Sequence, residues 1–222
     1  MSDLGDLTWP AVAAVRPVLV VPLGSLEQHG PHLPLDTDTR IATTVAASLA
    51  GDGFVVAPAV AFGASGEHAG FAGTLSIGQD ALELLVVELV RSADHFAGVV
   101  LVNGHGGNGA TLRRAVERLH HEGRRVLLVH CGVPGGDAHA GRAETSLLLH
   151  LAPGSVRLDR AEPGDARPWR DIAEQVTAGG VGAVSPNGVL GDPTGASADE
   201  GERLLAAICE RVRDEVAGWA HD

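Results

Sequence analysis

Apolar runs of strand length alternate along this chain with longer segments of helical periodicity. The runs predicted to form buried strands are Val18–Leu23, Phe54–Ala57, Gly98–Val102 and Arg125–Val129. The segments predicted to form helices are Thr39–Leu49, Ala81–His95, Ala110–His121, Ala143–Leu151 and Glu202–Ala217. Strands that alternate with helices pair in parallel, because each crossover returns the chain to the same edge of the sheet. We therefore expect an α/β fold, a three-layer α/β/α sandwich with a mostly parallel central sheet.

The chain has 222 residues, a length that suits one domain with a sizeable core, and it shows no internal repeat. We predict a single domain over residues 1–222. Two segments lack a clear period. Ala61–Gly78 is rich in glycine, and long loops of this kind are usually functional or mobile. Asp159–Gly195 contains four prolines and is expected to be irregular, wrapping the domain edge or a partner subunit.

Acidic residues outnumber basic residues by 28 to 16, which gives a net charge of −12. A nucleic-acid-binding protein needs a basic surface, so that class is disfavoured. Cys131 and Cys209 are too few for a disulfide framework, which favours a reducing compartment. No apolar stretch has the length of a membrane span, and the first residues do not resemble a secretory signal. We expect a cytoplasmic protein without nucleic-acid or membrane partners.

The densest group of ionisable side chains follows the first predicted strand. This loop contains Glu27, His29, His32, Asp36 and Asp38. Open α/β sheets place their chemistry in loops at the carboxyl ends of strands. Carboxylates and imidazoles together form the ligand set of Zn²⁺, Mn²⁺ or Fe²⁺. The pattern predicts metal or acid–base chemistry, because a merely solvated acidic loop would need neither histidine.

A glycine-rich loop, Asn103–Asn108, follows the third predicted strand. Gly104–Gly109 matches the G-x-G-x-x-G pattern of a dinucleotide site between a strand and a helix. Such a site needs an acid near the end of the next strand, and this chain has none there. The competing interpretation is that the glycines bring the backbone close enough for His105 to face a metal. We favour the metal and keep nucleotide binding as a lower-ranked alternative.

A third group, with His139 and Glu144, follows the fourth predicted strand and opens a helix. Taken alone, Glu144 could be a capping carboxylate near a helix N-terminus, and His139 a hydrogen-bonded loop residue. However, the carboxyl ends of parallel strands lie along one edge of the sheet. The residues that could converge there are Glu27, His29, Asp38, His105 and Glu144.

Several short motifs therefore stand in a fixed order along the chain. They are Glu27-x-His29 with Asp38, Gly66-Glu67-His68 with Gly73-Thr74, Asn103–Asn108, His139-Ala140-Gly141-x-x-Glu144-Thr145 and Gly191-Asp192-Pro193. This combination resembles the creatininase family from about Trp9 to the final helix. The resemblance implies an amidohydrolase with a two-metal centre on an α/β fold, assembled as a hexamer or a related ring.

The resemblance also implies the ligands of two divalent ions per subunit, Zn²⁺, Fe²⁺ or Mn²⁺. Glu27, Asp38 and His105 would hold one ion. His29, Asp38 and a further carboxylate would hold the other, with Asp38 as the bridge between the two. The hydrolase would then cleave a C–N bond of a peptide or amide.

This chain departs from the creatinine-hydrolysing members at two places. Those members have the further carboxylate two residues after the histidine of the second motif, where this chain has Gly107. Glu144 is the expected substitute, and its role as ligand or as proton carrier stays open. Those members also have aromatic residues where this chain has Gly106 and Gly135-Gly136, so creatinine is not the expected substrate.

Within the family, the runs Pro22–Glu27, Leu35–Thr43 and Gly135–Gly141 are most similar to a peptidase branch. That branch cuts a ribosomally made precursor peptide near its C-terminus and releases the modified end during biosynthesis of a redox cofactor. The expected partner is therefore a modified precursor peptide. Hydrolysis of a small cyclic amide or formamide is the alternative. A ring in which the metals only hold subunits together is a further one.

The remaining side chains of the motifs receive hypothetical roles from mechanistic reasoning. His139 is expected to protonate the leaving nitrogen, with Glu144 beside it in catalysis. His32 and Asp36 are expected to orient the ligand loop. Glu67 and His68 are expected to contact the substrate or a neighbouring subunit, and Gly106 and Gly107 to contact the substrate.

Overall fold

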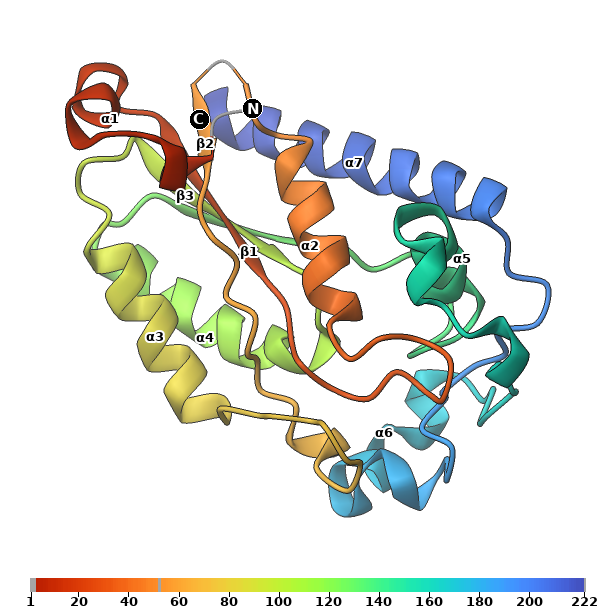
Figure 1. Cartoon of the computed structure of the whole chain (residues 1–222). Helices are drawn as coiled ribbons and strands as arrows, with labels where there is room; N and C mark the ends of the chain where they lie inside the picture. Colours follow the sequence, from red (N-terminus) through yellow and green to blue (C-terminus); the bar gives the residue numbers. More distant parts are fainter. Residues whose placement is uncertain (1–2, 52, 222) are drawn as a thin grey trace.

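The computed structural model describes residues 3–51 and 53–221, which form an α/β fold (Figure 1). The strands are β1 (Val18–Leu23), β2 (Phe54–Val56), β3 (Gly98–Asn103) and β4 (Val126–His130). The helices are α1 (Trp9–Val15), α2 (Thr37–Ala47), α3 (Gln79–Arg91), α4 (Gly109–His121), α5 (Arg142–Leu151), α6 (Trp169–Gly179) and α7 (Ala198–His221). Short 3-10 turns include η2 (Gly66–His68) and η3 (Gly106–Asn108).

The four strands form one parallel sheet in the order β2-β1-β3-β4. Val18 of β1 pairs with Phe54 on one side and with Gly98 on the other. The chain thus leaves β1 for β2 at one edge and then crosses back over β1 to reach β3. The direction of winding reverses between β1 and β3, and this is the point where open α/β sheets leave a crevice for ligands. The loops after β1 and β3 are therefore placed to build a site.

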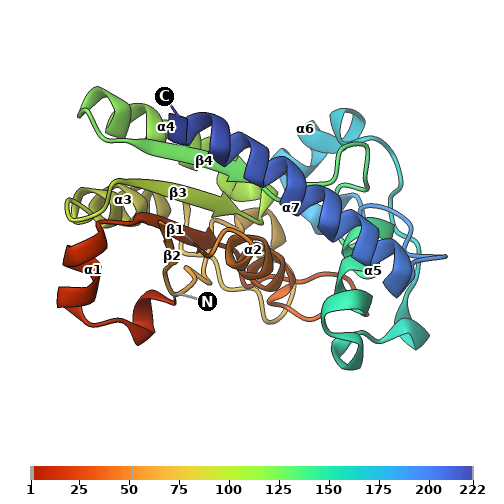
Figure 2. The ribbon, with the colours of Figure 1, turned by 90° about the horizontal axis from the view of Figure 1, so that it is seen from above.

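Helices cover both faces of the sheet, as Figure 1 and Figure 2 show. Successive side chains of a strand point to opposite faces. Val20 of β1 packs with Val45 of α2 and Val212 of α7 in one hydrophobic cluster. The next residue, Val21, packs with Leu82 of α3 and Leu112 of α4 in a second cluster. The predicted three-layer sandwich is confirmed, and the sheet of the described residues is wholly parallel.

Two helices were not predicted from the sequence. The short helix α1 starts at Trp9, beside Pro10 in its first turn, and none of its residues is buried. The other, α6, lies within Asp159–Gly195, and the expectation that this whole segment is irregular was wrong. Ile172 and Val176, one helical turn apart, pack against Val181 and Leu190 in a small separate cluster. Burial of this one face stabilises a helix that the prolines around it obscure.

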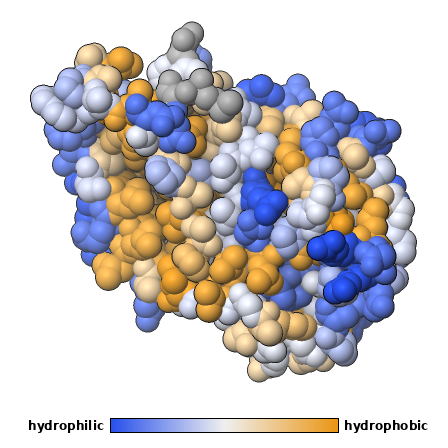
Figure 3. All heavy atoms as spheres, in the orientation of Figure 1, coloured by the Kyte–Doolittle hydropathy of each residue, from blue (hydrophilic) through white to orange (hydrophobic). Residues whose placement is uncertain are grey.

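Apolar side chains gather on one part of the molecular face drawn in Figure 3. This part lies over α3 and the loop before that helix, where Phe62, Leu75, Leu84 and Leu85 are exposed. By length and hydropathy, none of the helices in residues 3–51 and 53–221 qualifies as a bilayer-spanning segment. The cytoplasmic location stays a prediction.

Candidate metal centre

The loop after β1 closes on itself and turns two ionisable side chains inward. The backbone N–H of Glu27 donates to the carbonyl of Leu35 at 3.0 Å. Gly30 makes the turn between them with a φ of 65°, a conformation that favours glycine. Glu27 and His29 are completely buried as a result. The Nδ1 atom of His29 lies 3.1 Å from the carbonyl oxygen of Glu27, so Nε2 faces the centre, as in histidines that bind metals.

Asp38, in the first turn of α2, lies between histidines from two loops. Its Oδ1 is 3.1 Å from Nε2 of His29, and its Oδ2 is 3.1 Å from Nδ1 of His105. The hydroxyl of Ser25 donates to Oδ2 at 2.7 Å and fixes the carboxylate. This position agrees with the expected bridging role of Asp38, which stays a prediction.

His105 follows the carboxyl end of β3, directly beside β1. The side-chain amide of Asn103 donates to the His105 carbonyl at 2.7 Å and holds the turn. His105 Nε2 lies 3.2 Å from Oε2 of Glu27 and 3.4 Å from Oε1 of Glu67. The structure therefore brings together Glu27, His29, Asp38 and His105 at the carboxyl ends of β1 and β3.

Two glycines of the loop after β3 are required by close contacts within the site. A Cβ atom at position 104 would collide with the carbonyl oxygen of Asp38. A Cβ at Gly107 would collide with the Glu67 carboxylate and the His105 ring. At Gly106, by contrast, a Cβ would meet open space. The spacing that matches a dinucleotide loop is thus explained by packing around His105, and Gly107 is covered by Glu67.

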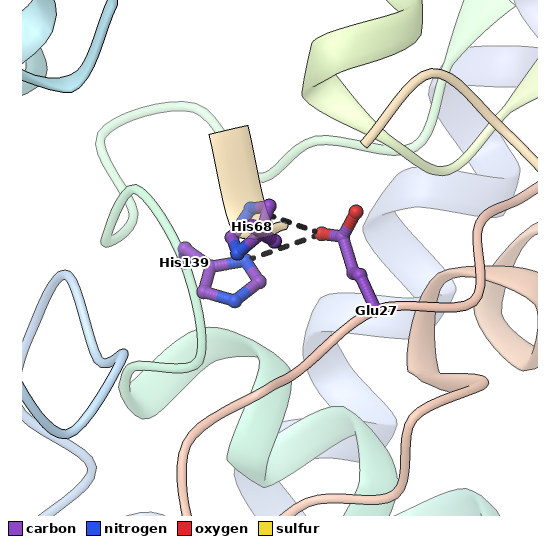
Figure 4. A group of neighbouring side chains, drawn as sticks. All are labelled: Glu27, His68 and His139. Atoms are coloured by element: carbon purple, nitrogen blue, oxygen red, sulfur yellow. Dashed lines mark ion pairs between the residues drawn. The ribbon is translucent and has the colours of Figure 1, made fainter. Parts of the chain in front are cut away.

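A second pair of histidines lies against Glu27 (Figure 4). His68, in η2, has its Nε2 3.3 Å from Oε1 of Glu27. His139, in the loop before α5, has its Nδ1 3.7 Å from the same oxygen. The ligand atoms of these three residues all lie within 4.8 Å of one another. The sequence placed His68 in a functional motif but assigned it to substrate rather than to the centre itself.

Gln28 was not predicted to belong to the site. Its buried side-chain amide lies 2.8 Å from Nδ1 of His68 and 3.1 Å from Nε2 of His139. The position of Gln28 between Glu27 and His29 was the only available signal.

Glu144 is at the rim of the cluster, in the first turn of α5. Its Oε2 accepts the backbone N–H of Ala140 at 2.6 Å and lies 4.0 Å from His29 Nε2. A quarter of the Glu144 side chain, 25%, is exposed, whereas His29 is buried. The ligand atoms of His29, His139 and Glu144 all lie within 4.8 Å of one another, so the carboxylate can reach either an ion or a substrate.

The two residues expected to support the ligand loop differ in their surroundings. His32 is buried, and its Nε2 lies 2.8 Å from the hydroxyl of Thr145 on α5. It therefore ties the loop after β1 to the helix that carries Glu144. Asp36 instead forms a partly exposed ion pair with Arg40 at 2.7 Å.

Electrostatics divides the four central histidines into two pairs. Burial alone would lower the pKa of His29, but the charge of Asp38, its hydrogen bond and the charges of Glu144 and Glu27 together outweigh burial and raise that pKa to about 10. Burial also opposes protonation of His105, yet Glu27 holds its pKa well above the usual value. Burial and the neighbouring histidines lower the pKa of His139 to about 4 and that of His68 to about 2. The first pair is therefore cationic beside the carboxylates, and the second pair is neutral.

The donor set fits divalent metal ions. Neither oxygen of Glu27 accepts a well-aligned hydrogen bond from any described residue, although the carboxylate is completely buried. A buried carboxylate without such bonds is costly unless a cation binds it. Imidazole nitrogens surround it, and nitrogen and carboxylate oxygen are ligands that Zn²⁺, Mn²⁺ and Fe²⁺ share. The ligand atoms of Glu27, His29 and Asp38 also lie within 4.8 Å of one another.

Comparison with known proteins decides the family. The sequence profile of the creatininase family, described as creatinine amidohydrolase, matches residues 5–216. The chain belongs to the creatininase family. A mutant creatininase of known structure has a TM-score of 0.79 and 28% identity, and the alignment covers 97% of this chain and 98% of that one. A creatininase variant described as the Zn-Zn type has a TM-score of 0.77 and 26% identity over 97% of both chains.

Curated relatives within the family share more of the sequence. The mycofactocin precursor peptide peptidase of Mycolicibacterium smegmatis is 50% identical over 100% of this chain and 93% of its own. That of Mycobacterium ulcerans is 49% identical over 99% and 92%. A 2-amino-5-formylamino-6-ribosylaminopyrimidin-4(3H)-one 5'-monophosphate deformylase from Methanothermus fervidus is 33% identical over 77% of this chain and 68% of its own. This creatininase-family hydrolase is thus similar to peptidases along its whole length.

Proposed function

We propose that this chain is a metal-dependent peptidase that cleaves the mycofactocin precursor peptide. The observation that carries this proposal is the buried cluster of possible metal ligands around Glu27. About half of the residues of the chain are also identical to those of mycofactocin precursor peptide peptidases, in alignments that cover nearly the whole chain. We also propose that residues 1–222 act as one hydrolase domain.

Two divalent ions per subunit are part of this proposal. Glu27, Asp38 and His105 would hold one ion, and His29, Asp38 and Glu144 the other. Bound ions of this kind polarise a carbonyl group and make water nucleophilic near neutral pH. The contact of the Asp38 carboxylate with both His29 and His105 supports its place in both sets.

The chain's own residues would orient the peptide and move the proton. The Nδ1 atom of His139 faces Glu27, and the lowered pKa of the ring, about 4, keeps this histidine neutral near pH 7. A proton gained there is given up readily, as a leaving amine requires. Glu144, partly exposed, stands beside it and can accept or pass on that proton if it does not bind an ion.

A cavity of about 560 Å³ adjoins this centre and supports a peptide as the substrate. Gln28 forms part of its wall and also touches His68 and His139. The remaining wall combines apolar side chains such as Phe71 with polar ones such as Arg160. This volume is within the range of ordinary ligand sites. We propose that the modified end of the precursor peptide binds here.

We further propose that the chain forms a homo-oligomer, a hexamer or a larger ring. The apolar surface over α3 supports this, because contiguous exposed apolar patches mark interaction sites. Leu84→Glu, on the exposed side of α3, would lower the molecular mass measured by light scattering. An unchanged mass would exclude this face from the subunit contacts.

The second candidate function is hydrolysis of a small cyclic amide or a formamide. The identity of 33% with a deformylase favours it. The two candidates are separated by incubating one metal-loaded preparation with the modified precursor peptide and with a panel of formamides and lactams. We expect cleavage of the peptide alone. Turnover of a small amide, with an intact peptide, would replace the peptidase proposal by the second candidate.

A further inference from the structure

The side chain of Gln28 joins four separate segments of the chain at one point. Its Oε1 accepts the backbone N–H of Gly30 at 2.8 Å. Its Nε2 lies 3.0 Å from the carbonyl of Gly188, 2.8 Å from His68 Nδ1 and 3.1 Å from His139 Nε2. Gly188 itself has a φ of 81°, and a Cβ there would collide with the Gln28 amide. The loop at Gly188 is therefore shaped to receive this side chain.

Two backbone groups determine which way the amide faces. The N–H of Gly30 needs an acceptor, and the carbonyl of Gly188 needs a donor. If the amide were turned by 180°, both of these contacts would join like groups. The oxygen of Gln28 therefore faces Gly30, and its NH₂ group faces Gly188 and the histidines.

This orientation fixes the proton positions of both histidines. Nε2 of His139 lies 2.8 Å from the backbone carbonyl of Gln28 and so must carry a hydrogen. It cannot also accept from the Gln28 amide, whose two hydrogens are left for Gly188 and His68. Nδ1 of His68 is then an acceptor, and the hydrogen of His68 is on Nε2.

The two histidines consequently present opposite groups to the same carboxylate oxygen. Figure 4 shows both rings beside Oε1 of Glu27. The protonated Nε2 of His68 lies 3.3 Å from that oxygen without a well-aligned hydrogen bond, and the unprotonated Nδ1 of His139 lies 3.7 Å from it. A lone pair faces a carboxylate favourably only when a cation lies between them, whereas an N–H needs none.

We propose that Gln28 is a positioning residue that gives His68 and His139 different roles. Its side-chain amide holds His68 as an N–H donor, which cannot bind a metal through Nε2. Its backbone carbonyl holds His139 with Nδ1 free for a cation or a proton. The proton positions follow from the hydrogen bonds of Gln28 and do not depend on the proposed hydrolytic function. Only the expected effect on catalysis rests on that function.

The test is nitrogen-15 NMR of the histidine rings in the whole protein, metal-free and loaded with zinc alone. The protonated and unprotonated nitrogens of a neutral imidazole have well-separated shifts. In the wild type we expect His68 to carry its proton on Nε2 in both states. Protonation of His68 on Nδ1, with zinc bound at Nε2, would overturn the proposal.

Substitution of Gln28 supplies the second arm. In Gln28→Glu the carboxylate can only accept, so the proton of His68 should move to Nδ1. Gln28→Met keeps the length without the amide and should leave His68 as a mixture of both forms. Gln79→Glu, at the exposed start of α3, is the matched control and should change neither the spectrum nor the zinc content.

The rate of peptide cleavage gives a second measurement that is independent of the NMR spectra. Loss of the partner that orients an active-site group costs about 10–100-fold. We expect kcat for peptide cleavage to fall by about this factor in Gln28→Met, with KM changed less. An unchanged His68 spectrum in Gln28→Glu would refute the proposal. Correct spectra from a protein that cleaves no precursor peptide would instead refute only the proposed function.

Discussion

The metal-free protein should lose stability steeply as the pH rises from 7.5 to 8.5. The cause is His29, whose pKa is about 10 in the folded chain because Asp38, Glu144 and Glu27 together outweigh the effect of burial. In the unfolded chain that pKa returns to about 6.5. A group whose pKa is raised by folding stabilises the folded protein fully when the pH is below its pKa in the unfolded chain. This stabilisation is lost as the pH rises towards its pKa in the folded chain. Between pH 7.5 and 8.5 the folded state therefore holds one proton more at His29.

The magnitude follows from this proton count. One extra proton in the folded state lowers the free energy of unfolding by about 1.4 kcal/mol per pH unit. His105, whose pKa is also raised, brings the expected slope to about 2.7 kcal/mol per unit if both protons remain bound. Few other titratable groups change the free energy of unfolding between pH 7.5 and 8.5. The chain has no lysine or tyrosine. Burial raises the pKa of Cys131 to about 12, so its thiol, which ionises at about pH 8.5 in the unfolded chain, adds to the slope only at the upper end of this pH range.

Urea unfolding of the chelated protein at pH 7.5 and 8.5 measures this slope. The His29→Gln variant should lose about half of it. The zinc-loaded protein should lose nearly all of it, because metals bind deprotonated ligands and displace these protons. Equal unfolding free energies at the two pH values in the chelated wild type would show that His29 is neutral. The electrostatic description of the centre would then be wrong.

Three further substitutions test separate parts of the structure. Gly107→Ala would push Glu67 and His105 apart and should lower the rate of peptide cleavage by about tenfold or more. In the control Gly106→Ala the added Cβ meets open space, so the rate should stay within about twofold of the wild-type rate. Glu144→Gln should weaken the binding of one ion by about 10–100-fold in a competition titration, and full affinity with slower cleavage would make Glu144 a proton carrier instead. Leu112→Ala, in the core between α4 and the sheet, should cost about 2–5 kcal/mol by urea unfolding with unchanged metal content, and a loss below about 1 kcal/mol would contradict the packing described.

The sheet was predictable because its strands are continuous apolar runs. A parallel sheet buried on both faces needs such runs, and Val18–Leu23 appears in the structure with the predicted bounds. The order of strands places the loops after β1 and β3 side by side, so the meeting of Glu27 with His105 also follows from sequence reasoning. The helix α6 was not predicted, because prolines flank it and its apolar face, Ile172 and Val176, is covered by Val181 and Leu190 outside the helix.

The part of the site that escaped prediction depends on contacts across the whole chain. Gln28 reaches the carbonyl of Gly188, 160 positions away, and no local pattern announces that bond. His68 was singled out by its motif, but its distance to Glu27 depends on the path of the long loop after β2. Ionisable residues at strand ends can be read from a sequence, whereas the hydrogen bonds that fix their protons require the fold.

Cleavage of the modified mycofactocin precursor peptide, followed by mass spectrometry, tests the central claim most directly. Metal-loaded wild type, chelated wild type, Glu27→Gln and the surface control Glu174→Gln are compared at equal concentration. We expect release of a modified C-terminal fragment by the loaded wild type and by Glu174→Gln only. An intact peptide with a protein shown to carry its metals would contradict this expectation, as would undiminished cleavage by Glu27→Gln.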